Sequence, residues 1–297
     1  MIVTEHPSAL KLFFVMQGSI VPRIRYKIFS VAALSALVLV IDRLALPLPD
    51  VPLAAMSVFG VALSLFLGFR NNAAYERWWE ARKLWGQLIA EIRTLGRQVT
   101  MFSDDTTARE RALSNAVAFA HLHRGALRNA DVRSEIAPWV GEAETNRLLS
   151  TPNPADAALS QISEFLNTPT VDGFGKLALS RTLSTITLAQ AGCERIATTP
   201  LPFVYSLLVR RTTYLYCFLL PFALTHSAGW FSPVLSAMVA YVFFGLQAVT
   251  RELEHPFSHV ENGLPLNAMC RTIEISVAQA LERPAPPSLA PENNILR

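Results

Sequence analysis

The sequence predicts an all-α membrane protein, and its composition and its apolar segments both support this prediction. Of the 297 residues, 51% are hydrophobic and only 16% are charged, a balance that suits a membrane protein with a substantial polar part. Residues 51–69 carry no charged side chain and are long enough to cross a hydrocarbon layer of about 30 Å as a helix. The chain shows no run of alternating apolar and polar residues that would indicate a β-strand.

Four apolar segments are expected to cross the membrane. The first and third are short, so their assignment depends on hydropathy together with the flanking residues. A single core helix would explain any one of them, but four in one chain favour membrane spans. The segments are residues 28–41 (extending weakly to 48), 51–69, 212–224 and 230–249.

The placement of basic residues predicts the orientation of the spans. Lys and Arg lie before the first span and just after the second and fourth, whereas the connection around residues 226–231 carries neither. Basic residues favour the cytoplasmic side of a membrane. We therefore expect a multi-pass membrane protein with both termini and the long middle section in the cytoplasm.

The rest of the chain is expected to form helices outside the membrane. Apolar residues recur at helical spacing in residues 75–100, 109–128, 142–149, 156–165 and 175–196. The predicted organisation is an interfacial N-terminal helix (1–27), spans one and two (28–69), a cytoplasmic helical region (70–211), spans three and four (212–249), a cytoplasmic C-terminal segment (250–283) and a disordered proline-rich tail (284–297).

Several motifs, found in a fixed order along the chain, resemble those of the bacterial bestrophin homologues. Each is a packing or positioning motif, so the evidence lies in their number and order. They are Gly68-Phe69 followed by Arg77-Trp78-Trp79, Ile196 to Tyr205, Arg211 to Tyr216, Glu252-Leu-Glu-His-Pro-Phe257, and Leu264 to Glu274. The resemblance implies a homopentameric ion channel of the bacterial inner membrane that transports ions passively, with no cofactor and no covalent chemistry.

Three apolar residues of the second span form a candidate pore lining. Val61, Leu65 and Phe69 recur every four residues and therefore lie along one helix face. The family resemblance implies that these positions form a hydrophobic neck around the fivefold axis. A ring of apolar side chains cannot replace an ion's hydration shell, so it gates by dewetting and widening. The alternative is that this face contacts lipid or a partner helix.

The resemblance also implies a second narrowing, made by an apolar residue of the cytoplasmic region. The corresponding helix contains Leu177, Leu179 and Leu183. Leu179 is the preferred candidate for this aperture, and packing in the protein core is the alternative.

The resemblance to bacterial members implies passage of monovalent cations, sodium in particular, whereas animal members pass chloride. The connection between the first two spans carries Asp42 and Asp50 against Arg43. Five copies of Asp50 would place negative charge at the outer mouth and enrich cations there. Alternatively, Asp50 caps the helix that begins near Val51-Pro52. An anion channel of the same fold remains the alternative function.

Calcium activation is not expected. In eukaryotic bestrophins an acidic run follows the Pro-Phe motif and forms a calcium clasp, but here Pro256-Phe257 is followed by a segment with only Glu261 as a carboxylate. Calcium requires six to eight oxygen ligands. His255 and His259 are four residues apart, but Pro256 disfavours a helix there, so no metal site is predicted.

Other polar and aromatic residues admit two interpretations. Arg70, Asn71 and Asn72 follow the apolar row and could hydrate leaving ions, or could contact headgroups and neighbouring helices. His121 and His123 are expected to be surface or interface residues. The remaining candidates are expected to pack or anchor: Trp78, Trp79 and Trp85, and the reduced cysteines Cys193, Cys217 and Cys270.

The sequence lacks the features of other functional classes. It has no phosphate-binding glycine loop, GxSxG or HExxH motif, and its spans contain no cluster of acids, bases or metal ligands, so an enzyme is not expected. The net charge of +3 does not indicate nucleic-acid binding. The expected partners are further copies of the chain, monovalent ions and membrane lipids. A membrane scaffold or receptor without conductance remains a competing hypothesis.

Overall fold

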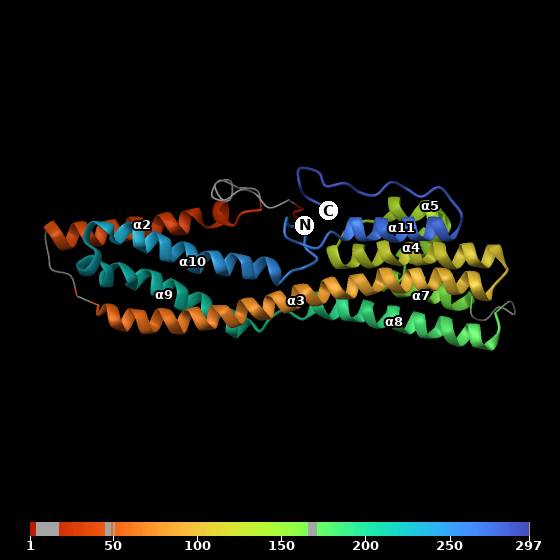
Figure 1. Cartoon of the computed structure of the whole chain (residues 1–297), viewed down its shortest axis with the longest axis horizontal. Helices are drawn as coiled ribbons and strands as arrows, with labels where there is room; N and C mark the ends of the chain where they lie inside the picture. Colours follow the sequence, from red (N-terminus) through yellow and green to blue (C-terminus); the bar gives the residue numbers. More distant parts are fainter. Residues whose placement is uncertain (4–17, 45–48, 50, 166–170, 297) are drawn as a thin grey trace. The chain divides into compact units, whose positions relative to one another are not determined.

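The computed structural model describes residues 1–3, 18–44, 49, 51–165 and 171–296. In these residues the regular structure is helical, apart from isolated β-bridges at Ile2, Glu292 and Ile295. The helices labelled in Figure 1 and the shorter ones between them are α2 (Val21–Leu44), α3 (Leu53–Phe102), α4 (Thr106–Arg128), α5 (Arg133–Val140), α6 (Glu142–Leu149), α7 (Pro154–Phe165), α8 (Gly173–Thr198), α9 (Phe203–Ala228), the 3₁₀ turn η1 (Gly229–Phe231), α10 (Ser232–Leu253) and α11 (Leu266–Ala280).

Three stretches of the described residues are long and apolar enough to cross a membrane. They are Val21–Leu44, Leu53–Phe102 and Phe203–Leu253. The last is interrupted by η1, which separates α9 from α10. Chain contacts divide the protein into two compact units. We call residues 5–78 and 200–255 the apolar unit, and residues 1–4, 79–199 and 256–297 the polar unit.

In the apolar unit, α2, α9 and α10 pack against one another and lie side by side in Figure 1. α3 joins this group through its own side chains. Met56, Leu63 and Leu67 of α3 form one buried cluster with residues of α9 and α10, among them Val209, Tyr216, Leu220 and Phe243. A membrane gives no hydrophobic gain for packing helix on helix, so close contact of this kind holds the unit together.

The polar unit is organised around α4, which packs against α5, α7, α8 and α11. α4 is buried over most of its length from Ala112 to Gly125. The side chain of Asp105 caps its N-terminus by accepting hydrogen bonds from the backbone N–H groups of Thr107 and Ala108, both at 3.0 Å. Its C-terminus stops at Asn129, which has a left-handed φ of 50°.

Helix boundaries differ from the expectation in two places. Residues 51–69 and 75–100 were expected to be separate helices, but α3 runs through both because the intervening residues contain neither Gly nor Pro. α2 begins at Val21, so the end of the expected interfacial helix forms its first turns. Residues 4–17 of that expected helix lie outside the described residues.

The structure describes residues 284–296 of the proline-rich tail, whose expected disorder stays a prediction. Near its end the backbone of this segment is bonded to the first residues of the chain. The N–H of Leu296 donates to the carbonyl of Met1 and that of Val3 to Asn294, both at 2.9 Å. These bonds explain why this part of the tail has a defined place.

Gly60 allows α3 to approach α9 closely. A Cβ atom at this position would lie 2.7 Å from the hydroxyl of Tyr216. The Tyr216 ring cannot easily move aside, because Phe59 and Phe243 pack edge-on against it. By contrast, a Cβ atom at Gly68 would meet nothing within 4 Å. Gly60 and Gly68 lie on the same helix but differ in the space around them, so substitution of Gly68 is a control for substitution of Gly60.

We expect Gly60→Ala to destabilise the protein by about 1–3 kcal/mol through overpacking. Gly68→Ala should be neutral or stabilising, because Ala is favoured over Gly in a helix. Thermal unfolding of the two variants in the same detergent measures the difference. Equal melting temperatures for both variants would contradict the close packing of α3 on Tyr216.

Candidate ion pathway

The predicted neck residues form an exposed row on α3. The exposed fractions of Val61, Leu65 and Phe69 are 69%, 57% and 60% in the single chain. The opposite face of the same helix is buried, with Leu63 and Leu67 among its residues. Residues two apart on an α-helix are separated by about 200°, so the row points away from the protomer's own core. Side chains in this position are available to line an axis shared with other subunits.

The polar residues after the row bind within the protomer. Arg70 is only 4% exposed, and its Nη2 lies 2.5 Å from the Glu254 carboxylate at the end of α10. Asn71 accepts a hydrogen bond from the buried hydroxyl of Thr250 at 3.3 Å. Asn72 donates to Glu76 of the same helix at 3.0 Å. The first two residues therefore join α3 to α10, and Arg70 is directed neither to headgroups nor to water.

The structure buries Leu179, the candidate for the second narrowing, within the single protomer. Leu179 is 1% exposed and Leu183 is also buried, because both pack into the core of the polar unit. On the same helix, α8, Phe174 is 81% exposed and Leu177 is 51% exposed. A side chain that lines an opening between subunits must be free in the single protomer. Among the large apolar side chains of α8 this condition leaves Phe174, Leu177 and Leu188, of which Phe174 and Leu177 lie in its first turns. The spacing of leucines along α8 did not reveal which of them face inward.

Of the two acids between the first two spans, the structure describes only Asp42. Asp50 lies outside the described residues. The Asp42 side chain is largely buried, and its Oδ1 lies 3.8 Å from Nε2 of His226. Its carboxylate is therefore turned toward α9 within the protomer.

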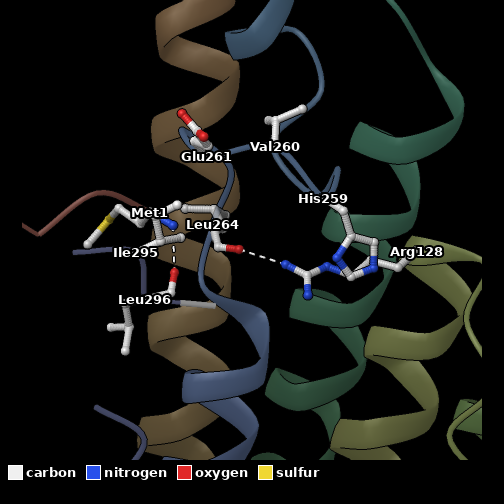
Figure 2. A pocket seen from close by; sticks show the side chains of 8 residues that line it. All are labelled: Met1, Arg128, His259, Val260, Glu261, Leu264, Ile295 and Leu296. Carbon is white, nitrogen blue, oxygen red and sulfur yellow. Dashed lines mark hydrogen bonds between the residues drawn. The ribbon is translucent and has the colours of Figure 1, made fainter. Parts of the chain in front are cut away.

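An arginine of α4, Arg128, is hydrogen-bonded to the segment that follows α10. The guanidinium of Arg128 donates to the carbonyls of Phe257 and Leu264 at 3.0 and 2.8 Å, and to Oδ1 of Asn267 at 2.9 Å. Figure 2 shows the bond to Leu264 in a cavity of about 280 Å³ that His259 and Glu261 also line. Burial and the nearby Arg124 lower the pKa of Arg128 to about 10, so it stays charged at neutral pH.

The described residues contain no group of three or more His, Cys, Asp or Glu side chains placed to hold a metal ion. Cys193 and Cys270 in the polar unit are buried, and burial raises the pKa of each thiol to about 12. Both thiols therefore remain protonated at physiological pH. Calcium independence stays a prediction for measurement.

The expectation that His121 and His123 lie at a surface or interface is wrong. His121 is buried, with Nε2 2.6 Å from Oε1 of Glu274 on α11. His123 is fully buried and stacks between Trp85 and Phe119, with ring centroids 5.6 and 5.8 Å away. Neither of its ring nitrogens has a hydrogen-bond partner. The two residues point in different directions on a helix that is buried on nearly all sides, which the spacing in the sequence did not reveal.

Comparison with known proteins identifies the family. The model described as bacterial/fungal bestrophin protein matches residues 1–279. The chain belongs to the bestrophin family. A solved structure of a bacterial bestrophin homologue from Klebsiella pneumoniae has 31% sequence identity and a TM-score of 0.82, covering 88% of this chain and 99% of that one. The protein is therefore a multi-pass all-α membrane protein of the bestrophin fold, and it is not an enzyme.

Two relatives bear on the transported ion. The voltage-dependent anion channel-forming protein mll4386 of Mesorhizobium japonicum is 45% identical over 98% of this bestrophin and 95% of its own length. The voltage-dependent anion channel-forming protein YneE of Escherichia coli is 38% identical over 94% and 93%. These names overturn the expectation of sodium conduction and favour the alternative, an anion channel. The expectation came from the resemblance to bacterial members, with charge at the outer mouth as an additional argument, and an apolar neck has no preference for either sign of charge.

The buried His123 gives a testable pH dependence of stability. Burial lowers its pKa from 6.5 to about 3, so the folded protein holds it neutral while the unfolded chain protonates it below pH 6.5. Its contribution is therefore present above pH 6.5 and is lost as the pH falls from 6.5 toward 3. The loss between pH 7 and pH 5 should be about 2 kcal/mol per chain.

We expect His123→Phe, which retains an aromatic ring in the stack, to flatten the acid limb of the stability curve. His226→Gln is the control, because the His226 side chain is about half exposed. Melting temperatures between pH 5 and pH 8 measure the effect. An acid limb equally steep in wild type and His123→Phe would show that His123 does not cause it.

Proposed function

We propose that this bestrophin forms a homopentameric channel that conducts anions through a neck lined by Val61, Leu65 and Phe69. The name shared by its relatives over nearly the whole chain supports the anion, and the exposed apolar row of α3 supports the neck. Five copies around one axis would bury this row and enclose a pore. The ring would hinder ions of either charge until it widens and wets.

The proposed channel lies in the bacterial inner membrane with four crossings, namely α2, the first part of α3, α9 and α10. Each of these helices has more than 20 residues, enough for a layer of about 30 Å. Both termini and the region between α3 and α9 are cytoplasmic in this proposal, which the position of Lys and Arg next to the spans supports.

The neck is tested by reducing the size of its largest side chain. Phe69→Ala should raise single-channel conductance or open probability, because a wider ring dewets less readily. Phe66→Ala is the matched control, since Phe66 is also an exposed phenylalanine of α3 but lies off the row. Purified variants in planar bilayers provide the measurement. Identical currents for Phe69→Ala and wild type would refute the neck.

The ion is tested by reversal potentials under a chloride gradient. We expect the reversal potential of purified wild-type protein to move toward the chloride equilibrium potential and to stay there when sodium is replaced by a large organic cation. A potential that follows sodium would refute anion conduction. Absence of any current from correctly assembled pentamers would instead favour a scaffold or receptor.

A second narrowing is proposed at the start of α8, formed by Phe174 and Leu177. Phe174→Ala should raise conductance without loss of stability, because its side chain contacts little within the protomer. Leu179→Ala should lower the melting temperature, since truncation of a buried Leu costs about 2–5 kcal/mol. Bilayer recording and thermal unfolding of both variants separate the two roles. The assignment fails if only Leu179→Ala changes the conductance.

A further inference from the structure

We propose that Arg70 and Glu254 form a rotational lock that holds the neck row of α3 toward the pore axis. In this role both are positioning residues, and the proposal depends on the neck assigned under the proposed function. The observation that carries it is a nearly buried ion pair one residue after Phe69, which joins α3 to the end of α10.

The pair lies on the face of α3 that determines its rotation. Arg70 continues the buried stripe of Leu63 and Leu67 and precedes the buried Ala74. The apolar side chains of the stripe fix how closely α3 approaches its neighbours, but each apolar contact has little preference of direction. A charged pair at 2.5 Å is directional, since rotation of α3 would separate two charges in a site with little water.

Glu254 contacts α3 at two places. Its carboxylate accepts from Arg70, and its backbone carbonyl accepts from Nε of Arg77 at 2.8 Å. Arg70 and Arg77 are seven residues apart, which is about two helical turns, so both point to the same side of α3. Between them, the Thr250 hydroxyl donates to Asn71 at 3.3 Å. The end of α10 thus holds α3 at successive turns just past the neck.

A neighbouring pair supplies a matched control. Glu252 of α10 pairs with Arg23 of α2, which does not carry the neck. In both pairs the glutamate lies at the C-terminal end of α10, Glu252 in its last turn and Glu254 as its C-cap, and the arginine belongs to another helix. Loss of the Arg23 pair should affect the stability of the unit without turning α3. The comparison separates a lock on the neck from general support of α10.

The first test measures gating. Arg70→Gln and Glu254→Gln should each raise open probability severalfold, because α3 can then turn its apolar row away from the axis. The combined variant Arg70→Gln/Glu254→Gln should have no greater effect than either single change, and the reversed pair Arg70→Glu/Glu254→Arg should return open probability toward wild type. Arg23→Gln should leave it unchanged. Additive effects of the two single variants would overturn the lock.

The second test measures rotation directly. Phe69→Cys and Phe66→Cys are reacted with a water-soluble thiol reagent in lipid nanodiscs, and labelling is followed by mass. The native cysteines are buried and should react slowly. With Glu254 intact, residue 69 should react faster than residue 66, and Glu254→Gln should reduce this ratio severalfold. An unchanged ratio would overturn the lock, whereas a lower stability alone would not alter it.

The outcomes distinguish this proposal from the proposed function. If Phe69→Ala conducts like wild type, or residue 69 does not react in the wild-type background, the neck itself is wrong. If Phe69→Ala raises conductance but Glu254→Gln changes neither gating nor the labelling ratio, only the lock is wrong. Should Glu254→Gln fail to assemble, Glu254→Asp retains the charge on a shorter side chain and should give an intermediate ratio.

Discussion

The division of α3 into two opposite faces is the constraint on which the rest of the candidate pathway depends. One face is buried by α9 and the other membrane helices through Met56, Leu63 and Leu67, and this packing leaves Val61 and Leu65 exposed. Apolar side chains exposed on a protomer must find lipid or another protein surface. In the proposed pentamer, this row would face the shared axis and line a narrow pore. The polar residues at its end, Arg70 above all, are bound within the protomer, so the row is left as an apolar surface.

In the proposed channel, the barrier to conduction and the choice between anions and cations have separate physical origins. An apolar neck limits the flow of every ion because it cannot supply ligands for a dehydrated one. It therefore gives no preference for ions of either sign. Asp42, one of the two acids that favoured cations, is turned toward His226 within the protomer. A count of charged residues in a connection overestimates the field at a mouth when such residues are paired.

The helical core of the polar unit buries several polar and ionisable side chains. His121 pairs with Glu274, whereas His123 is kept neutral by burial and contributes its ring to an aromatic stack. Arg128 closes the segment after α10 with bonds to neutral oxygens and needs no acidic partner there. The same segment carries His255 and His259, four residues apart in the sequence. In the structure, the cation bound by the backbone carbonyls of this segment is the guanidinium of Arg128.

The sequence by itself determined the helical class, the family and the long apolar helices, and it placed Val61, Leu65 and Phe69 on one helix face, because hydropathy and helical spacing are local properties of the chain. It did not determine which leucine of α8 is buried, where α3 ends, or which residue Arg70 pairs with. Leu177 and Leu179 look alike in the sequence, and only the packing of α8 leaves one exposed and buries the other. Arg70 and Glu254 are 184 residues apart, so their ion pair exists only once folding brings the end of α10 next to α3.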